Sequence, residues 1–117
     1  MGKLMRSYVC GDADEALIYE TIGNYFDNIV ERFPDNDALI IPYQNIHWSY
    51  KKFQQEVNRL ATGLLNLGIS KGDRVGIWGP NSVEWCLTQF ATAKIGAIMV
   101  CINPAYRAYE LEYALNK

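Results

Sequence analysis

The residues whose spacing comes nearest to a chemical motif are Gly76 and Gly79, in the segment GIWGPNS between an apolar run and a helical pattern. A dinucleotide site needs three glycines in a G-x-G-x-x-G pattern, so that backbone N–H groups can approach a pyrophosphate. Only two are present here, and Pro80 removes one N–H donor that would face a phosphate. The segment favours a plain strand-to-helix turn. A nicotinamide-dependent oxidoreductase is the alternative that would use these glycines.

Titratable side chains form no catalytic cluster in the sequence. His47 is the only histidine, which excludes a histidine-based metal cluster, and it has no obvious acidic partner nearby in sequence. Glu110 and Glu112 are two residues apart and would lie on different faces of a helix, so we expect solvated charges. Of the three cysteines, Cys86 and Cys101 stand in apolar contexts. We expect buried, reduced thiols and a reducing compartment.

The composition indicates an ordinary globular domain. Of 117 residues, 50% are hydrophobic and 21% charged, and the formal net charge is -2. This length makes about one domain, and the charge balance offers no basic surface for nucleic acid. Apolar runs fall far short of the ~20 residues that a membrane span needs. The start lacks the apolar core of a signal peptide, so a chain complete at Met1 is expected in the cytoplasm.

Four segments have helical patterns that position these residues. Thr21 is a predicted N-cap for an amphipathic helix that a proline ends. Ser49 caps a second helix, with Gly68 just past its end, and Ser82 caps a third. The segment from Tyr106 onward also has a helical pattern.

Four short runs read as strands. DALIIPY and IHWSY flank a turn and predict a β-hairpin. GDRVGIWG and GAIMVCI, on either side of the third helix, predict buried parallel strands of a β-α-β unit. The fold class is therefore α/β, and a sheet of only two parallel strands would leave an edge and helix faces uncovered.

Three segments in order resemble the opening of an adenylate-forming acyl-CoA synthetase. They are TIGNYFDNIVERFPDNDALII, WSYKKFQQEVNRLATGLLNLGISKGDRVGIWGPNSVEW and ATAKIGAIMVCINPAYRAYELEYALN. Their wording is most similar to medium-chain fatty acyl-CoA synthetases of animal mitochondria. The resemblance implies that residues 19–117 are an incomplete N-terminal part of the large domain of such an enzyme, after an irregular extension at residues 1–18.

The resemblance also implies a two-step ligase reaction. A fatty acid and ATP give an acyl-adenylate and pyrophosphate with Mg²⁺ present, and coenzyme A then displaces AMP. The family's phosphate loop, adenine segment, ribose segment and catalytic lysine have no counterpart in this sequence. No catalytic, cofactor-binding or metal-binding residue is therefore assigned, and we expect the chain alone to bind no cofactor and to be inactive. A mitochondrial location is implied by resemblance only.

Asn103, Pro104 and Tyr106 are the residues that we expect near a substrate. They follow the last predicted strand, and α/β proteins place ligand crevices at the carboxyl ends of strands. The alternative is that Asn103 and Pro104 only set the turn. A second function of a different class is a non-catalytic interaction module, which would self-associate or bind a full-length synthetase through uncovered apolar surfaces.

Overall fold

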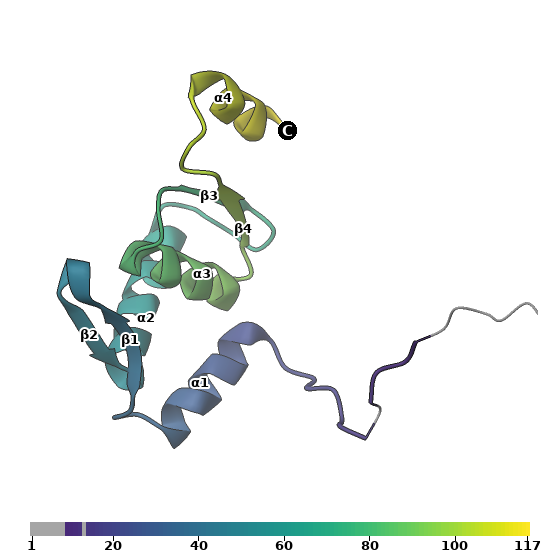
Figure 1. Cartoon of the computed structure of the whole chain (residues 1–117), viewed down its shortest axis with the longest axis vertical. Coiled ribbons are helices and arrows are strands. Elements are labelled where there is room, and N and C mark those ends of the chain that lie inside the picture. The colour runs from purple at the N-terminus through teal and green to yellow at the C-terminus, as the bar shows by residue number, and fades with distance from the viewer. Residues whose placement is uncertain (1–8, 13) are drawn as a thin grey trace, which may run out of the picture.

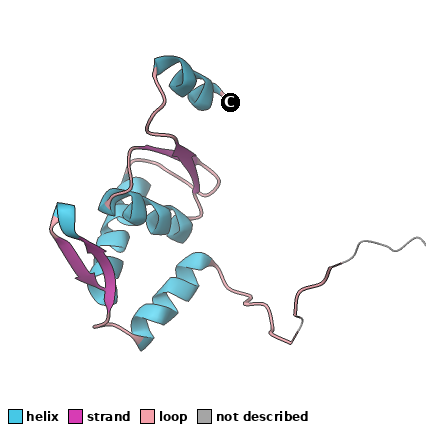
Figure 2. Ribbon diagram, viewed as in Figure 1, coloured by secondary structure: helices cyan, strands magenta, loops and turns pink. Residues whose placement is uncertain are grey.

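The computed structural model describes residues 9–12 and 14–117, and within them it forms an α/β fold with two small sheets (Figures 1 and 2). An extended segment leads into the first helix (Figure 1). In chain order the elements are α1 (Ile22–Arg32), β1 (Asp37–Ile41), the 3₁₀ helix η1 (Pro42–Gln44), β2 (Ile46–Ser49), α2 (Tyr50–Asn66), β3 (Arg74–Trp78), α3 (Val83–Ile95), β4 (Ile98–Ile102) and α4 (Ala108–Asn116).

Side-chain caps begin the first three helices. The hydroxyl oxygens of Thr21, Ser49 and Ser82 each accept a hydrogen bond from the backbone N–H three residues on, at 3.2, 3.3 and 3.4 Å. Such caps satisfy N–H groups that have no partner within the helix. Gly68 follows α2 with a φ of 89°, a left-handed conformation that favours glycine. These predicted boundaries are confirmed.

The helix α4 begins at Ala108, two residues later than its pattern suggests. Arg107 has extended backbone angles, and its N–H donates to the carboxylate of Glu110 at 3.0 Å. Glu110 is exposed, as expected, and its carboxylate also satisfies a backbone donor at the start of this helix.

The first sheet is the predicted antiparallel hairpin of β1 and β2. Leu39 pairs with Trp48 and Ile41 with Ile46, and η1 makes the connection. The hairpin brings the Asp37 carboxylate to 2.8 Å from Nε2 of His47. His47 thus has an acidic partner after all. Sequence proximity misses it because the two residues meet only across the hairpin.

The second sheet is the predicted parallel pair β3 and β4, with α3 as the connection. The register runs from Arg74 opposite Ile98 to Trp78 opposite Ile102. A Cβ atom on Gly76 would lie 3.2 Å from Cδ1 of Ile102, so glycine leaves room for this buried side chain. The β-α-β unit is confirmed.

The two parallel strands are less buried than expected. Trp78 and Ile98 are each 49% exposed, and Cys101 is exposed and free. The prediction of a buried thiol is therefore wrong for Cys101, although Cys86 is half-buried. The physical reason is that α3 is the helix packed against these two strands in the part of the chain that the structure describes, so part of their apolar surface has no covering layer.

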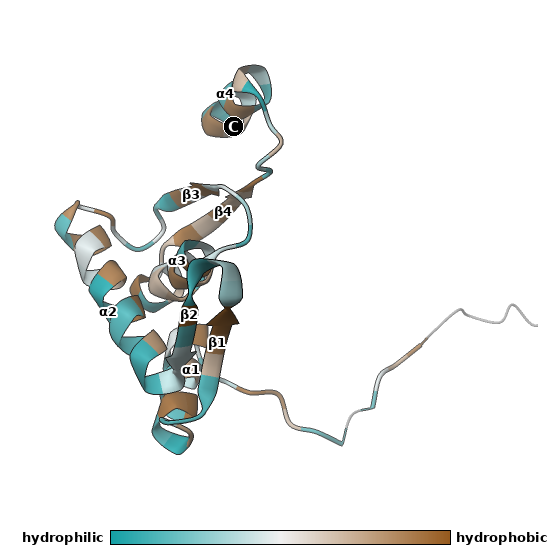
Figure 3. Cartoon of the chain, turned by 60° about the vertical axis from the view of Figure 1, so that its left-hand side comes forward, coloured by the Kyte–Doolittle hydropathy of each residue, from teal (hydrophilic) through white to brown (hydrophobic). Residues whose placement is uncertain are grey.

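The core lies where α1, α2 and α3 meet (Figure 3). The rings of Phe26, Phe53 and Phe90, one from each helix, have centroids 4.6 to 5.4 Å apart. Pairs of this kind add about 0.5–1.5 kcal/mol beyond their buried area. The buried residues of this cluster are Phe26, Val30, Phe53, Val57, Ala61 and Ala91.

A polar tie joins the same three helices. The Lys94 ammonium on α3 donates to Asp27 of α1 at 2.5 Å and to Asn58 of α2 at 2.8 Å, and Gln54 of α2 donates to Asp27 at 2.6 Å. Burial alone would raise the pKa of Asp27, but the hydrogen bonds from Lys94 and Gln54 and the lysine charge hold it below its ordinary value. The carboxylate therefore stays ionised beside its partners.

The helix α4 stands apart from the other elements (Figure 1). Its Tyr109 is 82% exposed, Tyr113 65% and Leu115 68%. Within the described residues, no helix combines the length and the apolar character that crossing a membrane requires.

Candidate functional site

The strand ends of the parallel sheet form the candidate site. Because Trp78 pairs with Ile102, the turns that follow β3 and β4 leave the sheet at the same edge. Between them lies a hollow of about 500 Å³, which we call the strand-end hollow. It is lined by Gly79, Pro80, Asn81, Trp85, Cys101, Ile102, Asn103 and Pro104.

One wall of the strand-end hollow is organised by Asn103. Its side-chain oxygen accepts the N–H of Ala105 at 3.0 Å. Its backbone carbonyl accepts the indole N–H of Trp78 at 3.1 Å and the N–H of Tyr106 at 3.0 Å. Asn103 and Pro104 line the hollow, whereas Tyr106 does not and is 39% exposed. The structure thus brings two of the three sequence-derived candidates together at this site.

The opposite wall is held from outside by the tip of the hairpin. The Tyr43 hydroxyl donates to the Asn81 carbonyl. The Gln44 side chain accepts the N–H of Val83 at 2.7 Å and donates to the Glu84 carboxylate at 3.0 Å. Sequence reasoning missed Tyr43 and Gln44, because they lie about 40 residues before their partners and carry no motif of their own.

The turn before α3 does not fit a phosphate group. At the start of this helix, the N–H of Val83 is taken by Gln44 and that of Trp85 by Ser82. The hydrogen bond from Gln44, together with bonds from its own backbone N–H and Ser82, lowers the pKa of Glu84, so the first turn keeps a negative charge. Occupied amides and a carboxylate both oppose anion binding. The dinucleotide-binding alternative thus finds no physical support here.

The groups that line the strand-end hollow can bind a ligand, and they form no catalytic arrangement. The side chains of the hollow offer amides, a thiol, an indole and apolar groups, with no carboxylate, imidazole or cation among them. Among the described residues, no three His, Cys, Asp or Glu side chains are grouped so as to hold a metal ion. The residues present therefore do not fit ATP phosphates with Mg²⁺, and no reaction step is assigned to them.

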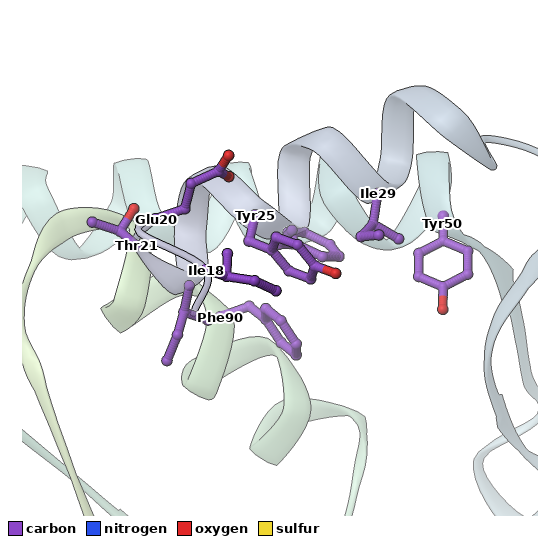
Figure 4. A pocket seen from close by; sticks show the side chains of 9 residues that line it. Ile18, Glu20, Thr21, Tyr25, Ile29, Tyr50 and Phe90 are labelled. Atoms are coloured by element: carbon purple, nitrogen blue, oxygen red, sulfur yellow. The ribbon is translucent and has the colours of Figure 1, made fainter. Parts of the chain in front are cut away.

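A second concavity, of about 390 Å³, lies between α1 and α3 (Figure 4). Figure 4 shows Tyr25 and Phe90 facing this groove, with Ile18 beside them. Its one carboxylate, on Glu20, already accepts a hydrogen bond from Asn28 at 2.8 Å. The groove is apolar and has no arrangement of groups for catalysis. Its lining residues are Ile18, Glu20, Thr21, Ile22, Tyr25, Phe26, Ile29, Tyr50 and Phe90.

The fold corresponds to the N-terminal subdomain of adenylate-forming enzymes. The chain matches the NpsA N-terminal subdomain of Klebsiella oxytoca with a TM-score of 0.75 and 32% identity, over 82% of this chain and 25% of that one. It matches a fatty acyl CoA synthetase of Mycobacterium tuberculosis with a TM-score of 0.79 and 36% identity, over 81% of this chain and 19% of that one.

The sequence defines the family more closely. A model of the AMP-binding enzyme family matches residues 26–117, and the chain belongs to this family. It is 49% identical over 111 residues to medium-chain acyl-CoA ligase ACSF2, mitochondrial, of Rattus norvegicus, covering 95% of this chain and 18% of that protein. The Danio rerio protein of the same name is 45% identical over 114 residues, covering 97% and 19%. The chain thus spans about a fifth of the length of these relatives.

Proposed function

We propose that this chain is the N-terminal framework of an ATP-dependent fatty acyl-CoA ligase of the medium-chain branch. The observation that carries the proposal is the 49% identity, over 95% of the chain, to a medium-chain acyl-CoA ligase. The substrates would be a fatty acid, ATP with Mg²⁺ and coenzyme A. Because the residues described above do not fit these phosphates, the chain by itself is proposed to be inactive.

The contribution of this chain is positional. Residues 19–117 would form part of the large domain, with residues 1–18 as an extension. In open α/β sheets, ligands lie beyond the carboxyl ends of the strands. The strand-end hollow is at such an edge, so Asn103 and Pro104, and Tyr106 just beyond them, are proposed to lie next to the substrate crevice.

Two assays test this proposal. The isolated chain is incubated with ATP, Mg²⁺ and octanoate, and acyl-dependent pyrophosphate exchange is followed; we expect none, and robust exchange would refute the inactivity. In the second assay, the chain replaces the matching segment of the rat ligase. The chimera is expected to form octanoyl-CoA, while a soluble, folded chimera without activity would contradict the framework role.

The relatives' names also suggest a location. Both the rat and the zebrafish relatives are named as mitochondrial, and we infer the same compartment for the protein that this chain serves. Fractionation of source cells with an antibody against residues 50–66 tests it. Signal in the cytosol alone would overturn the inference.

A non-catalytic interaction module is the second candidate, favoured by the exposed apolar side chains of α4. Tyr109, Tyr113 and Leu115 are each at least 65% exposed, and contiguous exposed apolar surface marks interaction sites. Light scattering of the purified chain, alone and with the rat ligase, discriminates. A stable monomer that forms no complex with the ligase would remove this candidate.

A further inference from the structure

The hairpin tip and the strand-end hollow meet although about 40 residues separate them in sequence. Gln44 uses both ends of its amide there: Oε1 accepts from the backbone of Val83 at 2.7 Å, and Nε2 donates to Glu84 at 3.0 Å. Tyr43 adds a hydrogen bond to the Asn81 carbonyl. The side-chain amide of Gln44 supplies both the acceptor and the donor that these two hydrogen bonds need.

These contacts fall on the wall of the strand-end hollow that the turn after β3 forms. The wall at Asn103 is held by hydrogen bonds within its own turn and by the Trp78 indole. On the facing wall, Gly79 and Pro80 belong to the turn after β3, and Asn81 lines the hollow while accepting from Tyr43. This second wall is therefore tied to a segment outside the hollow, in addition to the cap that Ser82 gives to Trp85.

We propose that Gln44 is a positioning residue for the strand-end hollow. It lines neither that hollow nor the apolar groove, and it acts by fixing the start of α3 and the turn before it. Tyr43 supports the same turn at Asn81. The effect on a substrate rests on the proposed function, since it requires that the hollow face the substrate crevice; the effect on the shape of the hollow does not.

Exchanging the charges of residues 44 and 84 in the 117-residue chain tests whether Gln44 positions the wall of the hollow. Gln44→Glu places a carboxylate beside Glu84, which breaks their hydrogen bond and adds repulsion. The double variant Gln44→Glu with Glu84→Gln exchanges the amide and the carboxylate, so both hydrogen bonds can form again. Gln55→Glu is the matched control, since it adds the same charge at an exposed position of α2.

The readouts lie in the hollow itself. Cys101 lines it and is free. Its alkylation by iodoacetamide is followed by peptide mass spectrometry, with exposed Cys10 as the internal reference. We expect the rate ratio of Cys101 to Cys10 to change about threefold or more in Gln44→Glu, because the wall of the hollow beside this thiol moves; a threefold change is the size of one lost hydrogen bond. The rate ratio should return to its wild-type value in the double variant. The NMR signal of the Trp85 indole should shift in Gln44→Glu and return to its wild-type position in the double variant.

Two outcomes would contradict the proposed role of Gln44 in shaping the strand-end hollow. One is an unchanged Cys101 rate and Trp85 signal in folded Gln44→Glu, and the other is a change that the double variant does not reverse. If Gln44→Glu fails to fold, Gln44→Met removes both hydrogen bonds without adding charge. A change of the same size is expected for Gln44→Met, and an unchanged alkylation rate of Cys101 would again overturn the proposal.

The functional part is read in the active chimera. Gln44→Glu is expected to raise KM for octanoate or coenzyme A by about threefold or more, while kcat stays within about twofold, because a wall that moves weakens binding rather than chemistry. The double variant should restore KM. An unchanged KM would refute the functional part. An inactive parent chimera would count against the proposed function, while the thiol readout still decides the role of Gln44.

Discussion

The three-helix body and the β3–β4–α4 region use similar apolar sequences with different results. In the body, Phe26 and Phe53 are each 5% exposed, and the Lys94 tie crosses all three helices. In the other region, Trp78 and Ile98 are 49% exposed and Tyr109 82%. Phe26 and Phe53 are covered because the third helix, α3, closes over the α1–α2 pair, whereas Trp78, Ile98 and Tyr109 lack such a cover in the part of the chain that the structure describes. The structural relative NpsA continues well beyond the part that this chain matches.

The largest expected effect is from Phe53→Ala in the body. The ring packs against Phe26 and Phe90 with centroids 5.4 and 5.3 Å away, so its removal should lower the free energy of unfolding by about 3–5 kcal/mol. Tyr109→Ala in α4 should change it by less than about 0.5 kcal/mol. Urea denaturation measures both. Equal losses would erase the contrast between the regions.

Removing the cation of the polar tie should have the next largest effect. Lys94→Met leaves Asp27 without its charged partner and Asn58 without its donor, for a loss of about 1–2 kcal/mol in thermal or urea unfolding. Lys52→Met is the control, because the Lys52 side chain is 47% exposed and its pair with Glu56 lies within one helix, so its removal should change stability less. If Lys52→Met lowers the free energy of unfolding as much as Lys94→Met does, the stabilisation by the polar tie does not depend on its burial.

Two glycines should respond to alanine with opposite signs. A Cβ atom on Gly23 would lie 3.2 Å from Cα of Lys94, whereas nothing lies within 4 Å of one on Gly63 in α2. Gly63→Ala should raise the free energy of unfolding by up to about 1 kcal/mol, because alanine has the higher helix propensity. Gly23→Ala should lower the free energy of unfolding by a net amount on the order of 1 kcal/mol, since crowding against Lys94 outweighs the gain in helix propensity. Stabilisation by both in differential scanning calorimetry would mean that α1 and α3 are loosely packed.

Acid should weaken the body through Asp27. Its folded-state pKa lies below the ordinary value of 3.8, so its carboxylate stabilises the fold above that pH, and the stabilisation is lost as the pH falls through the lowered folded-state pKa. The difference in unfolding free energy between wild type and Asp27→Asn should therefore shrink below about pH 4. A difference that is constant from pH 6 to pH 3 would contradict this assignment.

The smallest expected effect is a difference in reaction rate between two thiols. Burial raises the pKa of Cys86, with a partial opposing effect of its backbone hydrogen bond, while Cys101 is exposed on β4. A thiol reagent at neutral pH should modify Cys101 well before Cys86, and denaturation should make their rates similar. Faster reaction of Cys86 in the folded chain would reverse the proposed order of exposure.

Local patterns predicted much of this fold. Thr21, Ser49 and Ser82 were predicted as N-caps because a hydroxyl three residues before an amide is a signal contained within one turn. The hairpin followed from two short β-rich runs around a turn, and the β-α-β unit from apolar runs on either side of a helical pattern. The exposure of Cys101 could not be predicted, because periodicity says that a face is apolar and does not say whether anything covers it.

The candidate site was predicted less completely. Asn103 and Pro104 were found because they directly follow a strand. Gln44 was missed because its two hydrogen bonds depend on how the hairpin docks on α3, and that contact joins residues 39 and 40 positions apart. The Asp37–His47 pair was missed for the same reason over a shorter separation.

The aromatic triad also determines when this protein can fold during its own synthesis. Phe26 and Phe53 reach each other early, but the third ring, Phe90, lies on α3. Chains emerge from the ribosome N-terminus first, at about 5–20 residues per second. The nascent chain therefore carries α1 and α2 with an open apolar face until α3 has left the exit tunnel. A synthesis pause after α2 has left the tunnel, and before α3 has done so, would prolong the stage at which a chaperone can bind that face.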